Sequence, residues 1–587
     1  MCGIFGYVGK DNNVGNLILE GLKTLEYRGY DSWGIAVKNG KTIEIEKKVG
    51  KIGDPKLRFP KSSIGIGHTR WATHGGVTVE NAHPHLDCSR KIAVLHNGII
   101  ENFEELKKEL LEQGHKFVSE TDTEVMPHLI EEGLKKEGFA SSVRDAFNRL
   151  KGLNAIVALN ADSSEIIAAK TGSPLVIGVS DDGYYISSDS LGLVPHTRNL
   201  LFLEDNEMVI LGKTLKLISL PRGEEKTPDI QTVDWKFEKV DKGKYKHFLL
   251  KEINEQPQVV ENIALNYETE VKNLADLIDE AFGTFLLGCG TASYSGLAGT
   301  YLFSKIAKKH VNFSIGSEFN YLEDYLTPKS LVIPISQSGE TIDVVEPVAR
   351  AKQKGSRIAA ITNVLGSTLY RQSDFKILLG AGPEKAVVGT KSFTAMVAVL
   401  LFTAYTLAKR QAEGKKMLSL AAENVSEILK NHVGENIQKL AATLKNREHI
   451  YVIGRGISYA TALEATLKIK ETACLHAEGF AGGELKHGVI ALIEKGTPCI
   501  VIAPNDETYD DIISNAQEVK ARGGIIIGIG PRPNKVFDHF LQTADVAEAT
   551  IIPQVVVAQL LAYYLALARG IEDPDKPRNL AKSVTVK

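Results

Sequence analysis

The sequence predicts a multidomain protein of mixed class, with an α+β front part followed by two doubly wound α/β domains on parallel sheets. Three observations carry this prediction. Short alternating apolar runs fill residues 1 to about 220, apolar strands alternate with long helical windows from about 270 onward, and that later part repeats internally. Alternation with period two is typical of antiparallel strands, whereas strands separated by helices are typical of parallel sheets.

Composition agrees with a globular chain of several domains. The 587 residues are 43% hydrophobic and 24% charged, and 69 basic against 72 acidic side chains give a formal charge of −3. A length of about 150 residues per domain suggests about four units. Because the chain has no basic surplus of the kind that binds nucleic acid or an anionic membrane, we expect neither as a partner.

Five cysteines are too few for a disulfide scaffold, and an odd number cannot all pair, so we expect a reducing, cytoplasmic compartment. MCGIFGYVGKD has no basic leader before an apolar run, so we expect no signal peptide. The most apolar windows, Met396–Ala408 and Val555–Ala568, fall short of a bilayer span. We predict that they are buried helices.

The front part, residues 2–220, combines strands with a few helices. IFGYVG, WGIAVKNG, IAVLHNGII and AIVALNAD are predicted strands that end at Gly, Asn or Asp. Helical stretches cover Val14–Tyr27 and Phe103–Glu112, and a third follows Thr121, which with Glu124 matches a capping box. Residues 221–250 are polar and dense in charge, as expected of a linker.

The back part repeats three apolar strand segments. Their ends are Gly290, Ser336 and Asn363 in the first half and Gly456, Ala503 and Gly530 in the second. The intervals are 46 and 27 residues in the first half and 47 and 27 in the second. This spacing predicts a duplicated βαβ domain, with copies over 270–410 and 437–577 and a tail over 578–587. Neither copy contains GxGxxG, so a dinucleotide cofactor has no specific support.

Cys2 is the first candidate for chemistry. After removal of the initiator methionine, the α-amino group of Cys2, with a pKa of about 8, can take the proton of its own thiol and so generate a nucleophile. Taken alone, a cysteine here is more often a small hydrophobic residue at the start of an edge strand. Three further segments favour the catalytic interpretation.

These segments supply the groups that attack on an amide requires. Arg70, with Thr73, can hold a carboxylate. Asn97 and Gly98 can form an oxyanion hole, and Asp122 can bind an ammonium group. The structural alternatives are a surface arginine, the hairpin turn that Asn-Gly favours, and an acid favoured by a helix dipole. Together the groups fit the side-chain amide of a free amino acid such as glutamine.

MCGIFGYVG, YRGYDSWG, HTRWATHG, ENAHPH, HNGIIEN and SETDTE closely resemble motifs of the glutaminase domain of class II glutamine amidotransferases. The resemblance spans residues 2–220. It implies an N-terminal-nucleophile αββα fold, Cys2 as the nucleophile and an oxyanion hole from Asn97 and Gly98. It also implies a set of residues that hold glutamine or gate ammonia: Arg70, Trp71, Thr73, His74 and Asp122. Trp33 departs from the family pattern, in which a small residue follows Asp-Ser.

Five histidines of this part invite comparison with a metal centre: His68, His74, His83, His85 and His96. They show no HExxH or similar ligand spacing, and His-Pro-His holds its two side chains in an awkward extended arrangement. We therefore expect no metal.

The back part offers a phosphate site and titratable groups. After the strand that ends at Ser336, the turn SQSGET precedes a helical window, where hydroxyl and N–H groups favour an anion, with ordinary capping as the alternative. Lys468 and Glu471 share a helix face, which an ordinary ion pair would also explain. His487 lies among glycines and can act as an acid or base. Lys582 in the tail can form a Schiff base with a ketone.

SQSGET, TKSFT, LKIKETACLHAE, GGELKHG and PRNLAKSVTV resemble tandem sugar-isomerase (SIS) domains. The resemblance implies a set of residues that bind a sugar phosphate: Ser336, Gln337, Ser338 and Thr341. It implies Lys582 as the Schiff-base lysine and Glu471 as the isomerising base. It also implies His487 as the ring-opening acid or base, with Lys468 near the sugar. Ala292 departs from the family, which has a sugar-contacting serine there.

The combined resemblance implies a glutamine-dependent enzyme that passes ammonia internally to fructose 6-phosphate and isomerises it to a 2-amino aldose. No redox or metal cofactor is expected, and the family suggests a homodimer. Two alternatives stay open: ammonia delivery to a different sugar phosphate, and a sugar-phosphate sensor with vestigial groups. The presence of Cys2, Glu471, His487 and Lys582 argues against the sensor.

Overall fold

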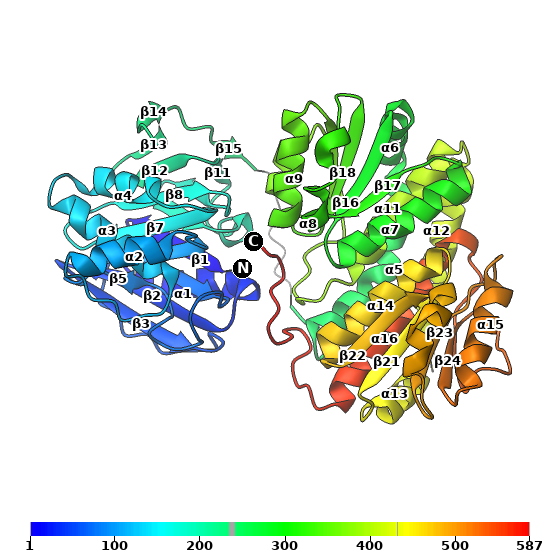
Figure 1. Ribbon diagram of the computed structural model, residues 1–587. Coiled ribbons are helices and arrows are strands. Elements are labelled where there is room, and N and C mark those ends of the chain that lie inside the picture. Colours follow the sequence, from blue (N-terminus) through cyan, green and yellow to red (C-terminus); the bar gives the residue numbers. More distant parts are fainter. Residues whose placement is uncertain (1, 234–240, 431–432, 586–587) are drawn as a thin grey trace. The chain divides into compact units, whose positions relative to one another are not determined.

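The computed structural model describes residues 2–233, 241–430 and 433–585, which form two compact units (Figure 1). The first comprises the described residues of Met1–Lys239 together with those of Ala581–Lys587, and the second comprises those of Val240–Leu580. Each unit is built around its own hydrophobic cores.

Two antiparallel sheets form the centre of the first unit. Their strand orders are β15-β11-β9-β10-β1-β4-β2-β3 and β14-β13-β12-β8-β7-β6-β5. The strands are β1 (Gly3–Gly9), β2 (Ser32–Asn39), β3 (Thr42–Val49), β4 (Ile64–Arg70), β5 (His85–Leu86), β6 (Ile92–Gly98), β7 (Asn154–Asn160), β8 (Ile166–Thr171), β9 (Val176–Ser180), β10 (Gly183–Ser187), β11 (Asn199–Phe202), β12 (Glu207–Leu211), β13 (Leu215–Ser219), β14 (Glu224–Lys226) and β15 (Gln231–Thr232).

Alternation along the strands produces four layers. Ile4 lies in a core that joins the two sheets and includes Leu95 of the second sheet. Its neighbour Phe5 faces the opposite side of the first sheet and packs in a core with Ile18 of helix α1. The outer face of the second sheet packs against three helices, so the order is helix, sheet, sheet, helix. The helices are α1 (Val14–Leu25), α2 (Phe103–Glu112), α3 (Val125–Leu134) and α4 (Phe139–Asn148).

The helix predicted after Thr121 begins as a 3₁₀ turn, η2 (Asp122–Glu124), and continues as α3. The predicted capping box is wrong. The Thr121 hydroxyl lies 3.0 Å from both His85 Nε2 and the Ser119 hydroxyl, and it makes no capping bond. Glu124 instead accepts hydrogen bonds from the backbone N–H groups of Val118 and Ser119, because the preceding loop folds back over the carboxylate.

Each half of the second unit contains a five-stranded parallel sheet. The orders β17-β16-β18-β19-β20 and β22-β21-β23-β24-β25 are equivalent and correspond to a doubly wound α/β fold. The strands are β16 (Gly283–Gly288), β17 (Asn312–Ile315), β18 (Ser330–Ser336), β19 (Arg357–Thr362), β20 (Phe375–Leu378), β21 (His449–Gly454), β22 (His476–Ala481), β23 (Pro498–Ile502), β24 (Ile525–Gly530) and β25 (His539–Gln542). The predicted fold class is confirmed.

The two halves also share backbone detail. Gly290 has φ 54° and ψ −129°, and Gly456 has φ 54° and ψ −131°, each just before the helix that follows the first strand of its half. A positive φ of this size favours glycine. The helices of this unit are α5 (Phe248–Asn266), α6 (Glu268–Glu280), α7 (Thr291–Leu302), α8 (Gly316–Phe319), α9 (Ile342–Gln353), α10 (Thr368–Gln372), α11 (Lys391–Leu407), α12 (Gln411–Lys430), α13 (Val433–Leu444), α14 (Ile457–Ala473), α15 (Tyr509–Lys520) and α16 (Ile551–Ala568).

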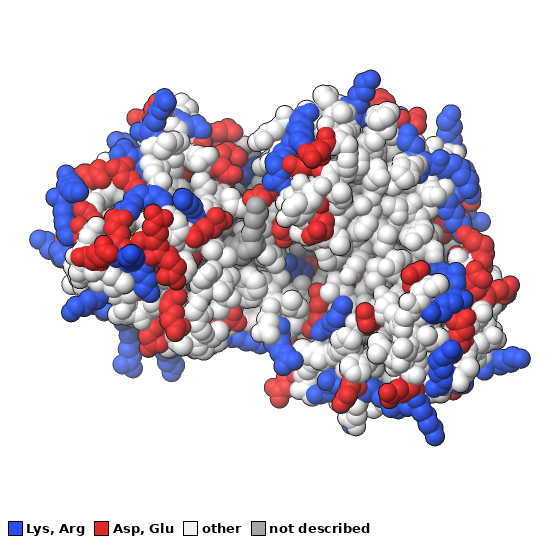
Figure 2. Space-filling view, in the orientation of Figure 1, with Lys and Arg blue, Asp and Glu red and all other residues white. Residues whose placement is uncertain are grey.

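The two apolar windows form helices α11 and α16, which are buried almost throughout, as predicted. Among the described residues, one segment, Ala547–Ala568, is long and apolar enough to span a membrane by composition, but 83% of its most apolar window is buried within the protein. This burial is typical of a core helix. On the face shown in Figure 2, acidic and basic side chains are interspersed over both units.

Residues 221–250, predicted as a linker, are only partly described. Strands β14 and β15 pair at the edges of the two sheets of the first unit, and α5 begins at Phe248. The stretch 234–240 lies outside the described residues.

Candidate active site

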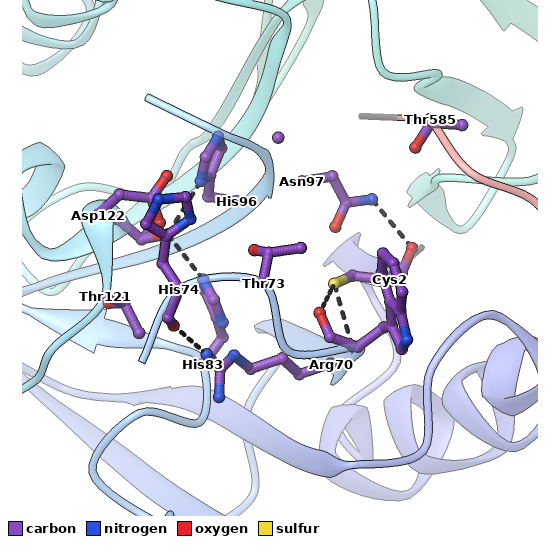
Figure 3. Close-up of a pocket in the computed structure, with 13 residues that line it drawn as sticks. Cys2, Arg70, Thr73, His74, His83, His96, Asn97, Thr121, Asp122 and Thr585 are labelled. Atoms are coloured by element: carbon purple, nitrogen blue, oxygen red, sulfur yellow. Dashed lines mark hydrogen bonds between the residues drawn. The ribbon is translucent and has the colours of Figure 1, made fainter. Parts of the chain in front are cut away.

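One pocket of the first unit brings together all eight residues predicted for glutamine chemistry (Figure 3). Because β1 pairs with β4 antiparallel, with Gly3 opposite Thr69, the start of the chain lies beside the end of the strand that carries Arg70. Strand β6 ends nearby with Asn97 and Gly98. The pocket is lined by Cys2, Arg70, Trp71, Thr73, His74, His83, His96, Asn97, Gly98, Thr121, Asp122, Thr123 and Thr585.

The Cys2 thiol is held by the backbone of Trp71. Trp71 N–H donates to Cys2 Sγ at 3.3 Å, and the thiol contacts the Trp71 carbonyl oxygen at 3.6 Å. Burial raises the pKa of the Cys2 thiol, while the Trp71 N–H and the positive charges of Arg70 and Arg28 oppose that shift. A thiol in this position requires a nearby base for ionisation at neutral pH.

The side-chain amide of Asn97 has a fixed orientation. Its Nδ2 donates to the Cys2 carbonyl oxygen at 3.1 Å, and its Oδ1 lies 3.0 Å from His68 Nε2. His68 Nε2 is also 3.1 Å from the His96 carbonyl oxygen, which requires the proton to be on Nε2. Burial lowers the pKa of His68 to about 3, so its ring is neutral at physiological pH. The Asn97 N–H groups therefore face Cys2.

Gly98 and Asp122 complete this side of the pocket. Gly98 has φ +145°, and a Cβ there would lie 2.4 Å from the Leu153 carbonyl oxygen, so a side chain is excluded. Asp122 is buried and accepts a hydrogen bond from Ile100 N–H at 2.7 Å. This bond fixes one carboxylate oxygen of Asp122.

Two neighbouring histidines, His83 and His96, contact the Thr123 hydroxyl as uncharged rings. His83 Nε2 and His96 Nδ1 lie 3.0 Å and 2.9 Å from the Thr123 hydroxyl, beside Asp122. Burial lowers the pKa of both rings. They therefore add no positive charge to the pocket.

Arg70 is oriented by the turn that follows it. Its guanidinium donates to the carbonyl oxygens of His74, Gly75 and Gly76, with the Gly76 contact at 3.0 Å. Arg70 is only 3% exposed, so it is not the surface arginine of the alternative interpretation. A buried cation held in this way can bind a carboxylate by charge-assisted hydrogen bonds.

In the second unit, the turn after β18 is held by hydrogen bonds from its own backbone N–H groups to serine hydroxyls. Ser336 and Ser338 accept hydrogen bonds from the N–H groups of Gly339 and Glu340, at 3.0 Å and 3.2 Å. Thr341 precedes the first residue of α9. Gly339 has φ +67°, and a Cβ there would lie 2.0 Å from Ser367 Oγ. The other residue predicted for this turn is Gln337, whose carbonyl oxygen accepts from Asn363 N–H at 3.2 Å.

Helix α14 carries a buried charge cluster. Lys468 Nζ lies 2.7 Å from Glu471 Oε2 and 3.3 Å from Glu464 Oε1, and it donates to the Thr291 hydroxyl at 2.9 Å. Burial raises the pKa of Glu464 to about 8, although Lys468 opposes the shift. Burial alone would lower the pKa of Lys468, but the two carboxylates outweigh it and raise that pKa. The predicted pairing of Lys468 with Glu471 is therefore present, and it is not an exposed surface pair.

Two further predicted residues belong to other elements than helix α14. His487 is exposed at the end of the 3₁₀ helix Gly482–His487. Lys582 is partly buried and belongs to the first unit, whereas the α14 cluster belongs to the second. In the same tail, Thr585 lines the Cys2 pocket.

The two residues that depart from the family pattern, Trp33 and Ala292, are both buried in hydrophobic cores. Trp33 lies in strand β2, is 1% exposed and packs among apolar residues. Ala292 is buried in α7, and the neighbouring Ser293 hydroxyl donates to the Gly290 carbonyl oxygen at 2.7 Å.

The sequence analysis missed two supporting residues, His68 and Glu464. His68 precedes Arg70 by two positions on β4, so strand alternation places both on one face, a signal that could have identified it. Glu464 lies four residues before Lys468 on one helix, which is the spacing of an ion pair.

Comparison with known proteins agrees with both units. Residues 68–194 match the family described as "Glutamine amidotransferase domain", and residues 277–405 and 443–569 each match "SIS domain". The chain is 44% identical to the glutamine–fructose-6-phosphate aminotransferase [isomerizing] of Pyrococcus horikoshii over 603 positions, with 100% of both chains covered. It is 42% identical to the protein of the same name from Thermococcus kodakarensis, again over 100% of both chains.

Solved structures resemble the second part of the chain. The C-terminal domain of glucosamine-fructose-6-phosphate aminotransferase from Francisella tularensis is 33% identical, has a TM-score of 0.53, and aligns over 56% of this chain and 99% of its own. Tagatose-6-phosphate ketose/aldose isomerase from Escherichia coli, at 19% identity and a TM-score of 0.50 over 56% of this chain and 96% of its own, shares the fold. On full-length identity, the chain belongs to the family of glutamine–fructose-6-phosphate aminotransferases (isomerizing).

Proposed function

We propose that this protein converts L-glutamine and D-fructose 6-phosphate to L-glutamate and D-glucosamine 6-phosphate. The observation that carries the proposal is the convergence of all eight predicted glutaminase residues on one pocket around Cys2. Two SIS domains in the same chain supply the sugar-phosphate part.

The glutaminase reaction begins at Cys2. After removal of Met1, the Cys2 amine takes the thiol proton, and the thiolate attacks the side-chain amide of glutamine to release ammonia and leave a thioester that water hydrolyses. Asn97 supports the negative oxygen of the tetrahedral intermediate, because its amide has a second N–H besides the one bonded to the Cys2 carbonyl oxygen. Gly98 N–H is the partner donor.

Glutamine is held at its α-carbon groups. Arg70, whose guanidinium is positioned by three carbonyl oxygens, binds the carboxylate, and Asp122 binds the ammonium group. Thr73 and His74 complete this contact, and Trp71 gates the released ammonia. This assignment is supported by the family resemblance of HTRWATHG and by the shared pocket.

The sugar half uses the turn after β18 for phosphate, through Ser336, Gln337, Ser338 and Thr341. Helix α9 follows this turn, and its N-terminal dipole favours an anion there. Ammonia adds to carbon 2 of the open ketose.

Three side chains act on the sugar. Before ammonia adds, His487 opens the ring and Lys582 forms the Schiff base with the ketone. After ammonia has added, Glu471, held by Lys468, moves a proton between carbons 1 and 2.

We also propose four finer properties that the family resemblance supports. The first domain is an N-terminal-nucleophile glutaminase, the enzyme is a cytoplasmic homodimer, and ammonia passes internally between the sites. The domain limits 2–220, 270–410 and 437–577, with a catalytic tail over 578–587, belong to the same proposal.

A product assay tests the function. The enzyme is incubated with glutamine and, in turn, fructose 6-phosphate and other ketose and aldose phosphates, and the amino sugar is identified by mass spectrometry. We expect glucosamine 6-phosphate from fructose 6-phosphate. An amino sugar formed only from another phosphate would overturn the substrate assignment, and Ala292 is the position to examine in that case.

Cys2→Ala separates the two sites. We expect glutamine-dependent synthesis to disappear, while synthesis from ammonium salts continues. Equal loss of both activities in a folded Cys2→Ala protein would contradict the two-site mechanism. Intact mass spectrometry of the active enzyme should show loss of Met1.

A further inference from the structure

Away from the Cys2 pocket, the first unit contains a cluster of four metal-ligating side chains. Cys88 lies in the connection between β5 and β6, His115 follows α2, and His128 and Glu131 lie on α3. One ligand atom from each residue lies within 4.8 Å of every other, and among the described residues this is the one such group. We propose that Cys88, His115, His128 and Glu131 bind a structural Zn²⁺ ion.

The distances between the ligand atoms match a tetrahedral zinc site. His115 Nδ1 lies 3.2 Å from His128 Nδ1, and these two nitrogens lie 3.1 Å and 3.4 Å from Glu131 Oε2. Cys88 Sγ lies 3.5 Å and 3.6 Å from the same nitrogens. With Zn–N and Zn–O bonds of about 2.0–2.1 Å and a Zn–S bond of about 2.3 Å, the edges of a tetrahedron are about 3.3 Å between N or O atoms and about 3.6 Å to sulfur.

Carboxylates lie behind both histidines. His115 Nε2 donates a hydrogen bond to Glu132 Oε1 at 2.6 Å, so His115 Nδ1 presents a lone pair. His128 Nε2 is buried without a hydrogen-bond partner, 3.9 Å from Glu124 Oε1. With the His128 proton on Nε2, its Nδ1 also presents a lone pair to a cation. Carboxylates behind the histidines are the usual outer partners of zinc ligands.

The donor set selects the metal. One sulfur, two imidazole nitrogens and one carboxylate oxygen suit Zn²⁺, whereas Mg²⁺ and Ca²⁺ require oxygen ligands. Binding releases the Cys88 thiol proton to solvent, after which Cys88 and Glu131 together balance the 2+ charge. The histidines are 7% and 1% exposed, while Cys88 is exposed and offers a path for entry.

Four protein ligands close the coordination sphere, which indicates a structural ion and not a catalytic one. The ion would join three segments that are far apart in sequence. Helix α3 directly follows η2, which carries Asp122 and Thr123 into the glutamine pocket. The site therefore braces the helix on which the glutamine ammonium contact depends, and it differs from the histidines near Cys2, where the sequence analysis expected no metal.

Metal analysis of the untagged, full-length protein tests the proposal. The protein is produced with zinc supplementation, dialysed, and measured by inductively coupled plasma mass spectrometry. We expect about one zinc per chain, and less than about a tenth of that in Cys88→Ser and His128→Ala. Cys474→Ser and His310→Ala, which change the same residue types outside the cluster, should keep the wild-type content.

Further variants separate zinc loss from misfolding. Cys88→His preserves a ligand and should retain zinc, and Glu132→Gln should weaken binding by about 10–100-fold. Cobalt-loaded wild type should show a thiolate-to-cobalt charge-transfer band that is absent in folded Cys88→Ser. For glutamine, KM should rise in Cys88→Ser while ammonium-dependent synthesis is unchanged. A wild type without zinc after reconstitution, or variants that all keep zinc, would overturn the proposal.

Discussion

The buried histidines next to Cys2 should make the first unit sensitive to acid. His68 is fully buried, and its pKa of about 3 lies far below the 6.5 of an exposed histidine. Below pH 6.5 the unfolded chain takes up a proton at this residue, whereas the folded chain does not. The contribution of His68 to the free energy of unfolding is therefore fully present above pH 6.5. It is lost progressively as the pH falls toward 3.

The size of the effect follows from linkage. One proton that binds only in the unfolded state lowers the free energy of unfolding by about 1.4 kcal/mol per pH unit below the unfolded pKa. His68 alone therefore lowers it by about 2 kcal/mol between pH 6.5 and pH 5. His83, His85 and His96 have pKa values lowered by burial as well and act in the same direction. With a urea m-value of about 2–3 kcal/mol/M, the loss due to His68 lowers the urea concentration at the unfolding midpoint by about 0.7–1 M.

The assay is urea unfolding followed by tryptophan fluorescence at pH 7.5 and pH 5. Trp33, Trp71 and Trp235 all precede residue 240, so the signal reports on the front part of the chain. We expect His68→Gln, which keeps an N–H donor but does not titrate, to lose about 2 kcal/mol less than wild type on acidification. His310→Gln, at an exposed position, is the control. An identical pH dependence in wild type and His68→Gln would refute the reasoning.

Three further predictions concern individual side chains. Asn97→Ala should lower kcat of glutamine hydrolysis by about 10²–10³-fold, as for loss of one oxyanion donor, and ammonium-dependent synthesis should be unchanged in the same assay. Lys468→Met leaves the buried Glu464 and the partly buried Glu471 without their cation and should reduce the free energy of unfolding by about 3–5 kcal/mol, measured by denaturant titration; an unchanged midpoint contradicts the burial argument. Gly339→Ala places a Cβ against Ser367 at a positive φ, so KM for the sugar phosphate should rise in steady-state kinetics, while glutamine hydrolysis serves as the control.

Much of the fold follows from local patterns. The helix predicted over Phe103–Glu112 has those limits in the structure, and the repeat spacing corresponds to two sheets of the same strand order. The capping box at Thr121 failed because a side chain from β5, His85, and a folded-back loop compete for the same groups. Local sequence does not reveal His85 as a competitor, since it lies 36 residues from Thr121 along the chain.

The sequence by itself determined the fold class and the duplication and predicted a set of glutaminase residues, because periodicity and short motifs are properties of neighbouring residues. The tertiary structure decided which distant groups meet. It turned Asn97 toward Cys2 through His68, and it brought Lys468 of α14 to the Thr291 hydroxyl of α7. It also brought Cys88 within 3.6 Å of His128, 40 residues away. These contacts depend on strand register and helix packing, which bring together side chains that no local pattern connects.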